Sequence, residues 1–163
     1  MLGLTNLGII HTVIGLVALF AGLASLIRYQ DISSRNQTGK LYIFTTVLTC
    51  LTGFGIYQHG GFGAPHVLGI ITLVTLGIAA GAERLGWFGL AARYVAVISY
   101  SATFLFHWIP TITETSTRLP IGAPLITNRD GPELQTASGL LFLLFIIGAT
   151  LQFLKLRAQT KAA

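Results

Sequence analysis

Five long apolar runs limit what this chain can fold into more than any other feature. They cover residues 7–27, 41–57, 67–82, 90–109 and 137–154. A helix that spans a bilayer needs about 20 residues, with about 17 as the lower limit, and backbone groups in lipid must find their partners within the chain. Charged residues make up only 9% of the sequence, against about 25% in an average soluble domain. We therefore predict an all-α integral membrane protein in which residues 1–163 form a single domain.

We expect this domain to be a bundle of five transmembrane helices, one for each apolar run. The run at 137–154 contains no titratable side chain, so ordinary packing is its expected role. We interpret it as a C-terminal brace that faces lipid or another subunit, beside a core of four helices.

The distribution of Lys and Arg predicts the orientation of the bundle. Eight of the ten basic residues lie after the first, third and fifth runs or at the start of the fourth, and only Arg118 and Arg129 fall on the other side. The positive-inside rule then places the N-terminus outside and the C-terminus in the cytoplasm, in a multi-pass protein of the cell inner (plasma) membrane. No basic-aromatic surface motif accompanies these charges, so we expect the lipid bilayer and not nucleic acid as the partner.

Histidines recur on small-residue faces of three of the expected helices. At helical spacing, His11 shares a face with Gly15 and Gly22, and His66 shares one with Gly69. His107 lies near the end of the fourth run, and His59 lies just before the third. Because the helices alternate in direction, all four histidines are expected at the outer leaflet, where an ionisable residue predicts a functional site.

Haem b is the first cofactor that such a pattern favours. Two imidazoles on facing helices can ligate the haem iron, and we expect His11 to pair with His66 or His107. Gly15, Gly22 and Gly69 would leave room for the macrocycle, although small residues also serve close helix packing. The predicted protein is then a small membrane redox protein that transfers electrons to or from quinone or a partner subunit.

Two alternatives remain open. The first is a non-haem site for zinc, copper or iron, built from His11, His59, His66 and His107. The second is an accessory structural subunit of a membrane complex, in which the histidines only pack. The sequence predicts no catalytic residue for any of these functions.

Two connecting segments carry strong turn signals. Residues 59–66 contain three glycines and a proline between two histidines, which predicts a tight hairpin. Residues 111–133 contain three prolines, so we expect no continuous helix there. This outer segment is either a lid over the histidines or a plain connector.

The first half of the chain resembles known membrane proteins. His11, Gly15, Ala18 and Gly22, then the stretches 38–42 and 52–54, then His66, are similar to a group of small uncharacterised bacterial membrane proteins. Those proteins have histidines near helix ends and a Gly-x-x-Tyr stretch at the second helix. Here Arg35-Asn36-Gln37 stands where a His-Arg pair is expected. The layout is also similar to four-helix b-type cytochromes, which implies histidine-ligated haem.

Overall fold

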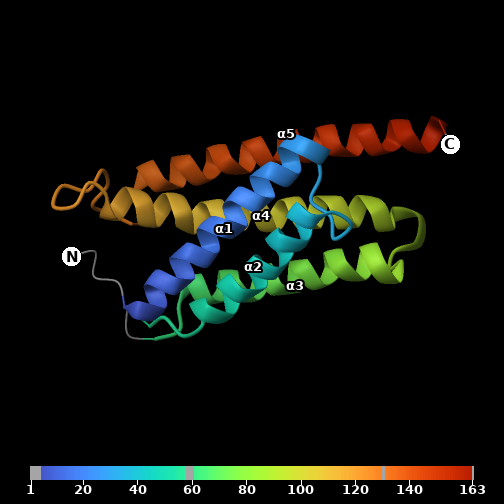
Figure 1. Cartoon of the computed structure of the whole chain (residues 1–163). Helices are drawn as coiled ribbons and strands as arrows, with labels where there is room; N and C mark the ends of the chain where they lie inside the picture. The colour runs from blue at the N-terminus through green and yellow to red at the C-terminus, as the bar shows by residue number, and fades with distance from the viewer. Residues whose placement is uncertain (1–4, 58–60, 130, 163) are drawn as a thin grey trace.

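The computed structural model describes residues 5–57, 61–129 and 131–162. Its helices are α1 (Asn6–Tyr29), α2 (Gln37–Gly53), α3 (Ala64–Leu85), the short η1 (Gly89–Ala91), α4 (Ala92–Arg118) and α5 (Pro132–Ala162) (Figure 1). The described residues contain no strand, so the predicted all-α fold with one helix for each apolar run is confirmed.

The chain folds as two helical hairpins with a fifth helix beside them. α1 packs mainly on α2, α3 packs mainly on α4, and α5 lies along α4 (Figure 1). The centre of the bundle is a cluster of small and aromatic side chains from the first four helices and the α1–α2 connection. Its buried members are Ala18, Ala21, Ile32, Tyr42, Leu76, Ala79 and Tyr100. Small residues of α1 and α3 thus let the helices approach the two tyrosines closely.

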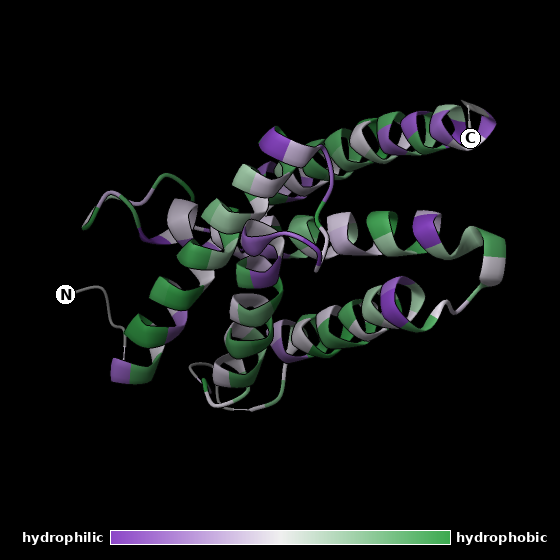
Figure 2. Ribbon diagram, turned by 45° about the vertical axis from the view of Figure 1, so that its right-hand side comes forward, coloured by the Kyte–Doolittle hydropathy of each residue, from purple (hydrophilic) through white to green (hydrophobic). Residues whose placement is uncertain are grey.

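Many large apolar side chains of the helices are exposed, and Figure 2 shows hydrophobic residues along most of the helices. Four helical segments of the described chain are long and apolar enough to cross a membrane: α1, α3, η1 with α4, and α5. α2 has 17 residues, which is about the lower limit for a spanning helix. In α5 only 6% of the most apolar window is buried, in keeping with the expected brace. These features are compatible with a multi-pass membrane protein.

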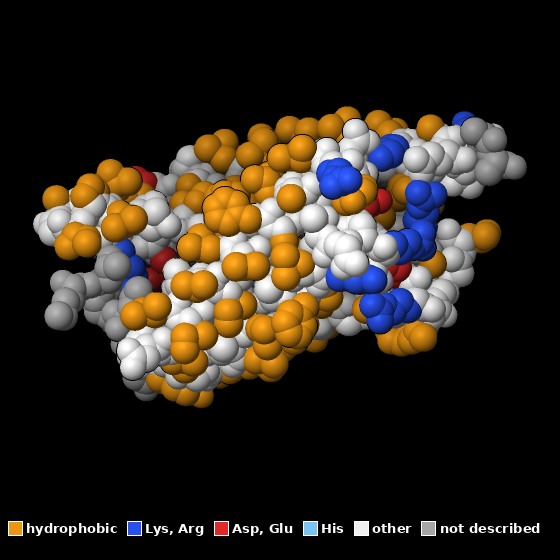
Figure 3. All heavy atoms as spheres, in the orientation of Figure 1, with side chains coloured by type: hydrophobic (Ala, Val, Ile, Leu, Met, Phe, Trp, Pro, Cys, Tyr) orange, Lys and Arg blue, Asp and Glu red, His pale blue; other side chains and the backbone are white. Residues whose placement is uncertain are grey.

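Basic side chains gather at one end of the bundle. Figure 3 shows most of the visible Lys and Arg side chains at the end where α5 finishes and where α1 connects to α2. These residues were predicted to lie on the cytoplasmic side, and the fold brings them to a common end.

α4 is longer than the fourth apolar run. The segment 111–133 is not one continuous helix, as predicted, but α4 continues through Pro110 to Arg118. Proline within a helix removes one backbone hydrogen bond, here the one to Phe106 O, and transmembrane helices tolerate this loss when neighbouring groups compensate. Threonine hydroxyls after Pro110 bond to other carbonyls of the same helix. The hydroxyls of Thr111, Thr113 and Thr117 each donate to a carbonyl one turn back, at 2.7–2.9 Å. Within the segment 111–133, residues 119–129 and 131 are non-helical.

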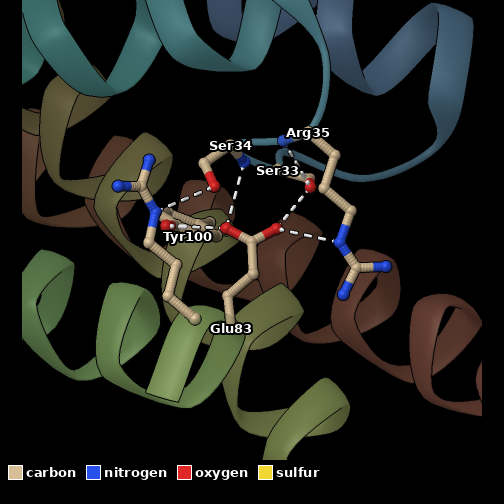
Figure 4. A network of polar contacts seen from close by, with 6 residues as sticks. Ser33, Ser34, Arg35, Glu83 and Tyr100 are labelled. Carbon is tan, nitrogen blue, oxygen red and sulfur yellow. Dashed lines mark hydrogen bonds and ion pairs between the residues drawn. The ribbon is translucent and has the colours of Figure 1, made fainter. Parts of the chain in front are cut away.

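A buried carboxylate fixes the α1–α2 connection to the second hairpin. Glu83 of α3 accepts hydrogen bonds from the Ser33 hydroxyl, from the Ser34 backbone N–H at 3.1 Å and from the Tyr100 hydroxyl at 3.1 Å (Figure 4). The Arg35 guanidinium lies 3.7 Å from the same carboxylate. Both hairpins are therefore held together at the basic end of the bundle.

Candidate functional site: the histidine cavity

A cavity of about 410 Å³ opens at the other end of the bundle, between the two hairpins. Ordinary ligand sites have volumes of about 300–1,000 Å³. We call this space the histidine cavity, because His11 of α1, His66 of α3 and His107 of α4 all line it. Phe54, Leu68, Phe106 and other apolar side chains form much of the remaining wall. The three described histidines therefore come together around one space, as their shared level in the bundle predicted.

His66 carries the strongest evidence for a ligand. The Gly63 backbone N–H donates to His66 Nδ1 at 3.2 Å, so Nδ1 is an acceptor and the neutral ring must carry its proton on Nε2. His66 is only 6% exposed, and Nε2 is a buried donor with no hydrogen-bond partner among the described residues. Leaving such a group unsatisfied costs about 1–3 kcal/mol, so a bound acceptor at this wall would stabilise the protein.

Two aromatic rings hold His66 in place. The Tyr57 ring stacks on it at 5.1 Å between centroids and the Phe62 ring at 5.2 Å, with interplanar angles of 25° and 29°. The glycine-rich connection between α2 and α3 thus supplies both the backbone donor to Nδ1 and part of the aromatic packing. The imidazole is oriented before any ligand arrives.

His11 has the opposite pattern of hydrogen bonding. Its Nδ1 lies 3.1 Å from Thr52 Oγ1 of α2, and the ring rests on Gly53, where an added Cβ would meet His11 Cε1 at 3.2 Å. The Thr52 hydroxyl donates its one hydrogen to backbone carbonyls of α2, with Leu48 O the nearer at 2.8 Å. Thr52 Oγ1 must therefore accept from Nδ1–H, which leaves Nε2 of a neutral His11 as an acceptor.

His107 is held inside the bundle. Its Nε2 lies 3.0 Å from Thr46 Oγ1, and its ring meets the edge of the Tyr42 ring at 5.9 Å between centroids. The side chain is buried, with 8% exposed. It contributes a polar edge to the cavity while one ring nitrogen is engaged by α2.

Charged residues stand at the rim of the cavity. Glu114 pairs with Arg118 one turn later on α4 and with Arg129 at 3.0 Å. Leu119 and Arg129 also line the cavity, and the Ile126 N–H donates to Ser116 O at 3.0 Å. The segment after α4 therefore folds back on that helix and forms part of the cavity wall, which is more than a plain connector does.

The predicted glycine positions separate into two groups. Gly69 lines the cavity and lies against the Phe54 ring, 3.0 Å from the position of an added Cβ. Gly15 and Gly22 are not among the cavity-lining residues. Gly15 faces Thr49, and the space beside Gly22 is filled by the Phe104 and Tyr42 rings, 2.7–2.9 Å from an added Cβ. These two positions serve contact between helices.

The predicted metal ligands do not form a close group. His59 lies outside the described residues. Among the residues that the structure describes, no three His, Cys, Asp or Glu side chains are grouped so that they could hold a metal ion. His11, His66 and His107 share the cavity but surround it from different helices.

Sequence reasoning missed the threonines of α2 that orient the imidazoles. Thr46 and Thr52 lie in the second apolar run, and each contacts one histidine. Their spacing from the histidines along the chain carries no signal, because the contacts join different helices. Cys50, the one cysteine, also lines the cavity.

Comparison with protein-family models, with curated proteins and with solved structures finds no match to this chain. The resemblance to b-type cytochromes therefore stays a prediction.

Proposed function

We propose that this protein is a multi-pass membrane protein that binds a small apolar molecule with an oxygen acceptor in the histidine cavity. The observation that carries the proposal is the buried Nε2–H of His66, which lacks a partner among the described residues. An acceptor oxygen on a ligand would provide that partner. The apolar wall around it would hold the carbon skeleton.

A membrane quinone is the ligand class that fits this description best. Its head group is flat and apolar, it dissolves in the bilayer, and its oxygens accept hydrogen bonds. The cavity has room for such a ring, and its lining combines aromatic side chains with imidazoles. The proposed function is therefore binding of a quinone-type molecule, in keeping with the quinone partner expected from the sequence.

We also propose the membrane setting of the site. If the basic end of the bundle faces the cytoplasm, as the positive-inside rule predicts, the histidine cavity lies near the outer leaflet of the inner membrane. A ligand then enters from the outer half of the bilayer or past the rim formed by Glu114 and Arg129.

Haem b is a second candidate, supported by three histidines from three helices around one cavity. A metal-bound histidine usually donates a hydrogen bond from its other ring nitrogen, whereas His66 Nδ1 accepts one from Gly63. His11 and His107 are therefore the better ligand pair. The ring packing beside Gly22 removes space that the macrocycle was expected to use. A bare zinc, copper or iron ion has less support, because the described residues form no group of three ligands.

The sole thiol provides a direct test of cavity occupancy. Cys50 lines the cavity, so a bound ligand should slow its reaction with N-ethylmaleimide. The probe is tetramethyl-1,4-benzoquinone, whose ring has no free position for addition of a thiol. In detergent-purified protein, we expect this quinone to slow labelling of Cys50 in a saturable manner, as followed by mass spectrometry.

The matched variant is His66→Phe, which keeps an aromatic ring but lacks the donor. We expect it to lose the protection of Cys50, while its midpoint of thermal unfolding shows that it still folds. Labelling of the wild-type protein that is unaffected by the quinone would overturn the proposal. An absorbance spectrum of the same preparation tests the haem alternative, since bound haem gives a Soret band that His11→Ala should abolish.

A further inference from the structure

We propose that the ligand of the histidine cavity donates a hydrogen bond as well as accepting one, so that a quinol binds more tightly than the corresponding quinone. We further infer that Thr52 is the positioning residue responsible for this preference. The inference rests on the proposed function of the cavity, and adds the redox form of the ligand and the residue that selects it.

The first step is the direction of the hydrogen bond between His11 and Thr52. Thr52 has one hydroxyl hydrogen, and carbonyl oxygens of its own helix lie at 2.8 Å and 3.1 Å from Oγ1. With its hydrogen used in this way, Oγ1 can only accept from His11 Nδ1, at 3.1 Å. A neutral His11 therefore holds a bare lone pair on Nε2.

The second step is that the His11 ring is fixed against α2. Gly53 leaves just enough space for it, since an added Cβ would lie 3.2 Å from His11 Cε1 and 3.6 Å from Nδ1. The same edge of the ring thus meets Thr52 and Gly53. The ring is bonded to α2 at Nδ1, which leaves the acceptor at Nε2 to a ligand.

The third step combines the two histidines. His66 Nε2–H is a donor without a partner among the described residues, and His11 Nε2 is an acceptor. Both residues line the same cavity but come from different helices. A quinone has only acceptors and can satisfy His66 alone. A quinol has hydroxyl groups that accept from His66 and donate to His11, so it makes one more hydrogen bond.

The experiment compares binding of three molecules of nearly the same shape by isothermal titration calorimetry. They are tetramethylhydroquinone kept reduced with dithionite, tetramethyl-1,4-benzoquinone, and the dimethyl ether of the hydroquinone, which has no donor. One neutral hydrogen bond changes affinity by roughly threefold to tenfold. We expect the hydroquinone to bind more tightly than both others by about this factor.

Two substitutions then test the role of Thr52. Thr52→Val removes the acceptor for Nδ1–H and frees the His11 ring to exchange the roles of its nitrogens, so the preference for the hydroquinone should disappear. Thr52→Ser keeps the hydroxyl and should retain the preference. Thr150→Val is the control, because the Thr150 hydroxyl bonds only to Ile146 O of α5, away from the cavity.

The outcomes separate this inference from the proposed function. If the quinone, the hydroquinone and the ether bind equally well, a ligand site exists, but the inference that it prefers a ligand with a hydrogen-bond donor is wrong. If Thr52→Val keeps the full preference, Thr52 is not the positioning residue. If none of the three molecules binds and Cys50 labelling is unchanged, the proposed function fails as well.

Discussion

The hydroxyl of Tyr42 on α2 lies 2.7 Å from Thr103 Oγ1 on α4. Both residues are fully buried, with 0% of their surface exposed. Thr103 donates its own hydrogen to Tyr100 O at 2.7 Å, so Tyr42 is the donor in this pair. The bond joins the two hairpins between the Glu83 network at one end and the histidine cavity at the other. It is the central polar contact between α2 and α4.

Tyr42→Phe should weaken the connection between the hairpins without leaving a large cavity. Hydrogen bonds between helices in membrane proteins contribute about 0.6–2 kcal/mol, and we expect the free energy of unfolding to fall by about this amount. Reversible unfolding in mixed micelles measures the change. Tyr94→Phe is the control, because the Tyr94 ring packs on Phe153 and should change stability by less than about 0.5 kcal/mol.

Glu83→Gln should loosen the connection between α1 and α2. The amide has one acceptor atom where the carboxylate has two, so the Ser33, Ser34 and Tyr100 donors cannot all keep their partner. We expect a loss of about 1–3 kcal/mol, together with faster hydrogen exchange at the Ser34 amide. Glu133→Gln, at an exposed position at the start of α5, should change neither quantity, and an unaltered Ser34 amide in Glu83→Gln would contradict this role.

Gly39→Ala should be strongly destabilising. An added Cβ at Gly39 would lie 2.0 Å from the Ser33 carbonyl oxygen, so the backbone that presents Ser33 to Glu83 must move. Overpacking of this kind costs about 1–3 kcal/mol, occasionally more. Gly139→Ala on α5 provides a matched comparison, since nothing lies within 4 Å of its added Cβ. That change should be neutral or stabilising by up to about 1 kcal/mol, as measured by the midpoint of thermal unfolding.

The orientation of the chain can be measured with reporter fusions. With the basic end of the bundle in the cytoplasm, a green fluorescent protein fused after residue 163 should fluoresce in a bacterial host. Alkaline phosphatase fused at the same position should be inactive, because it needs the oxidising periplasm to form its disulfides. Active phosphatase together with a dark fluorescent fusion would reverse the proposed orientation and place the histidine cavity at the cytoplasmic leaflet.

The helices could be predicted because their signal is local. Apolar runs of helical length indicated five helices, and the structure has a helix over each of them. The boundary at Pro110 could not be predicted in this way. Whether a helix continues through proline depends on the threonines and neighbouring helices that satisfy its backbone, and α4 continues to Arg118.

The candidate site was predictable only in part. The expectation that the histidines of the first, third and fourth runs lie close together follows from alternating helix directions, and His11, His66 and His107 do line one cavity. The expected roles of Gly15 and Gly22 in that cavity did not follow, because a small residue on a helix face serves equally well for packing. Only the positions of Phe104, Tyr42 and Thr49 show that these glycines contact side chains of other helices.

By itself the sequence determined that this chain forms apolar helices with histidines near one end and most basic residues near the other, because composition and helical period act within single segments. The tertiary structure alone decided that His11 and His66 line one cavity, and that the Thr52 hydroxyl of another helix meets His11 Nδ1. The Gly63 N–H that meets His66 Nδ1 is a local contact, three residues earlier at the start of α3. A donor and an acceptor in one cavity are therefore a property of helix packing, and no single stretch of sequence contains them.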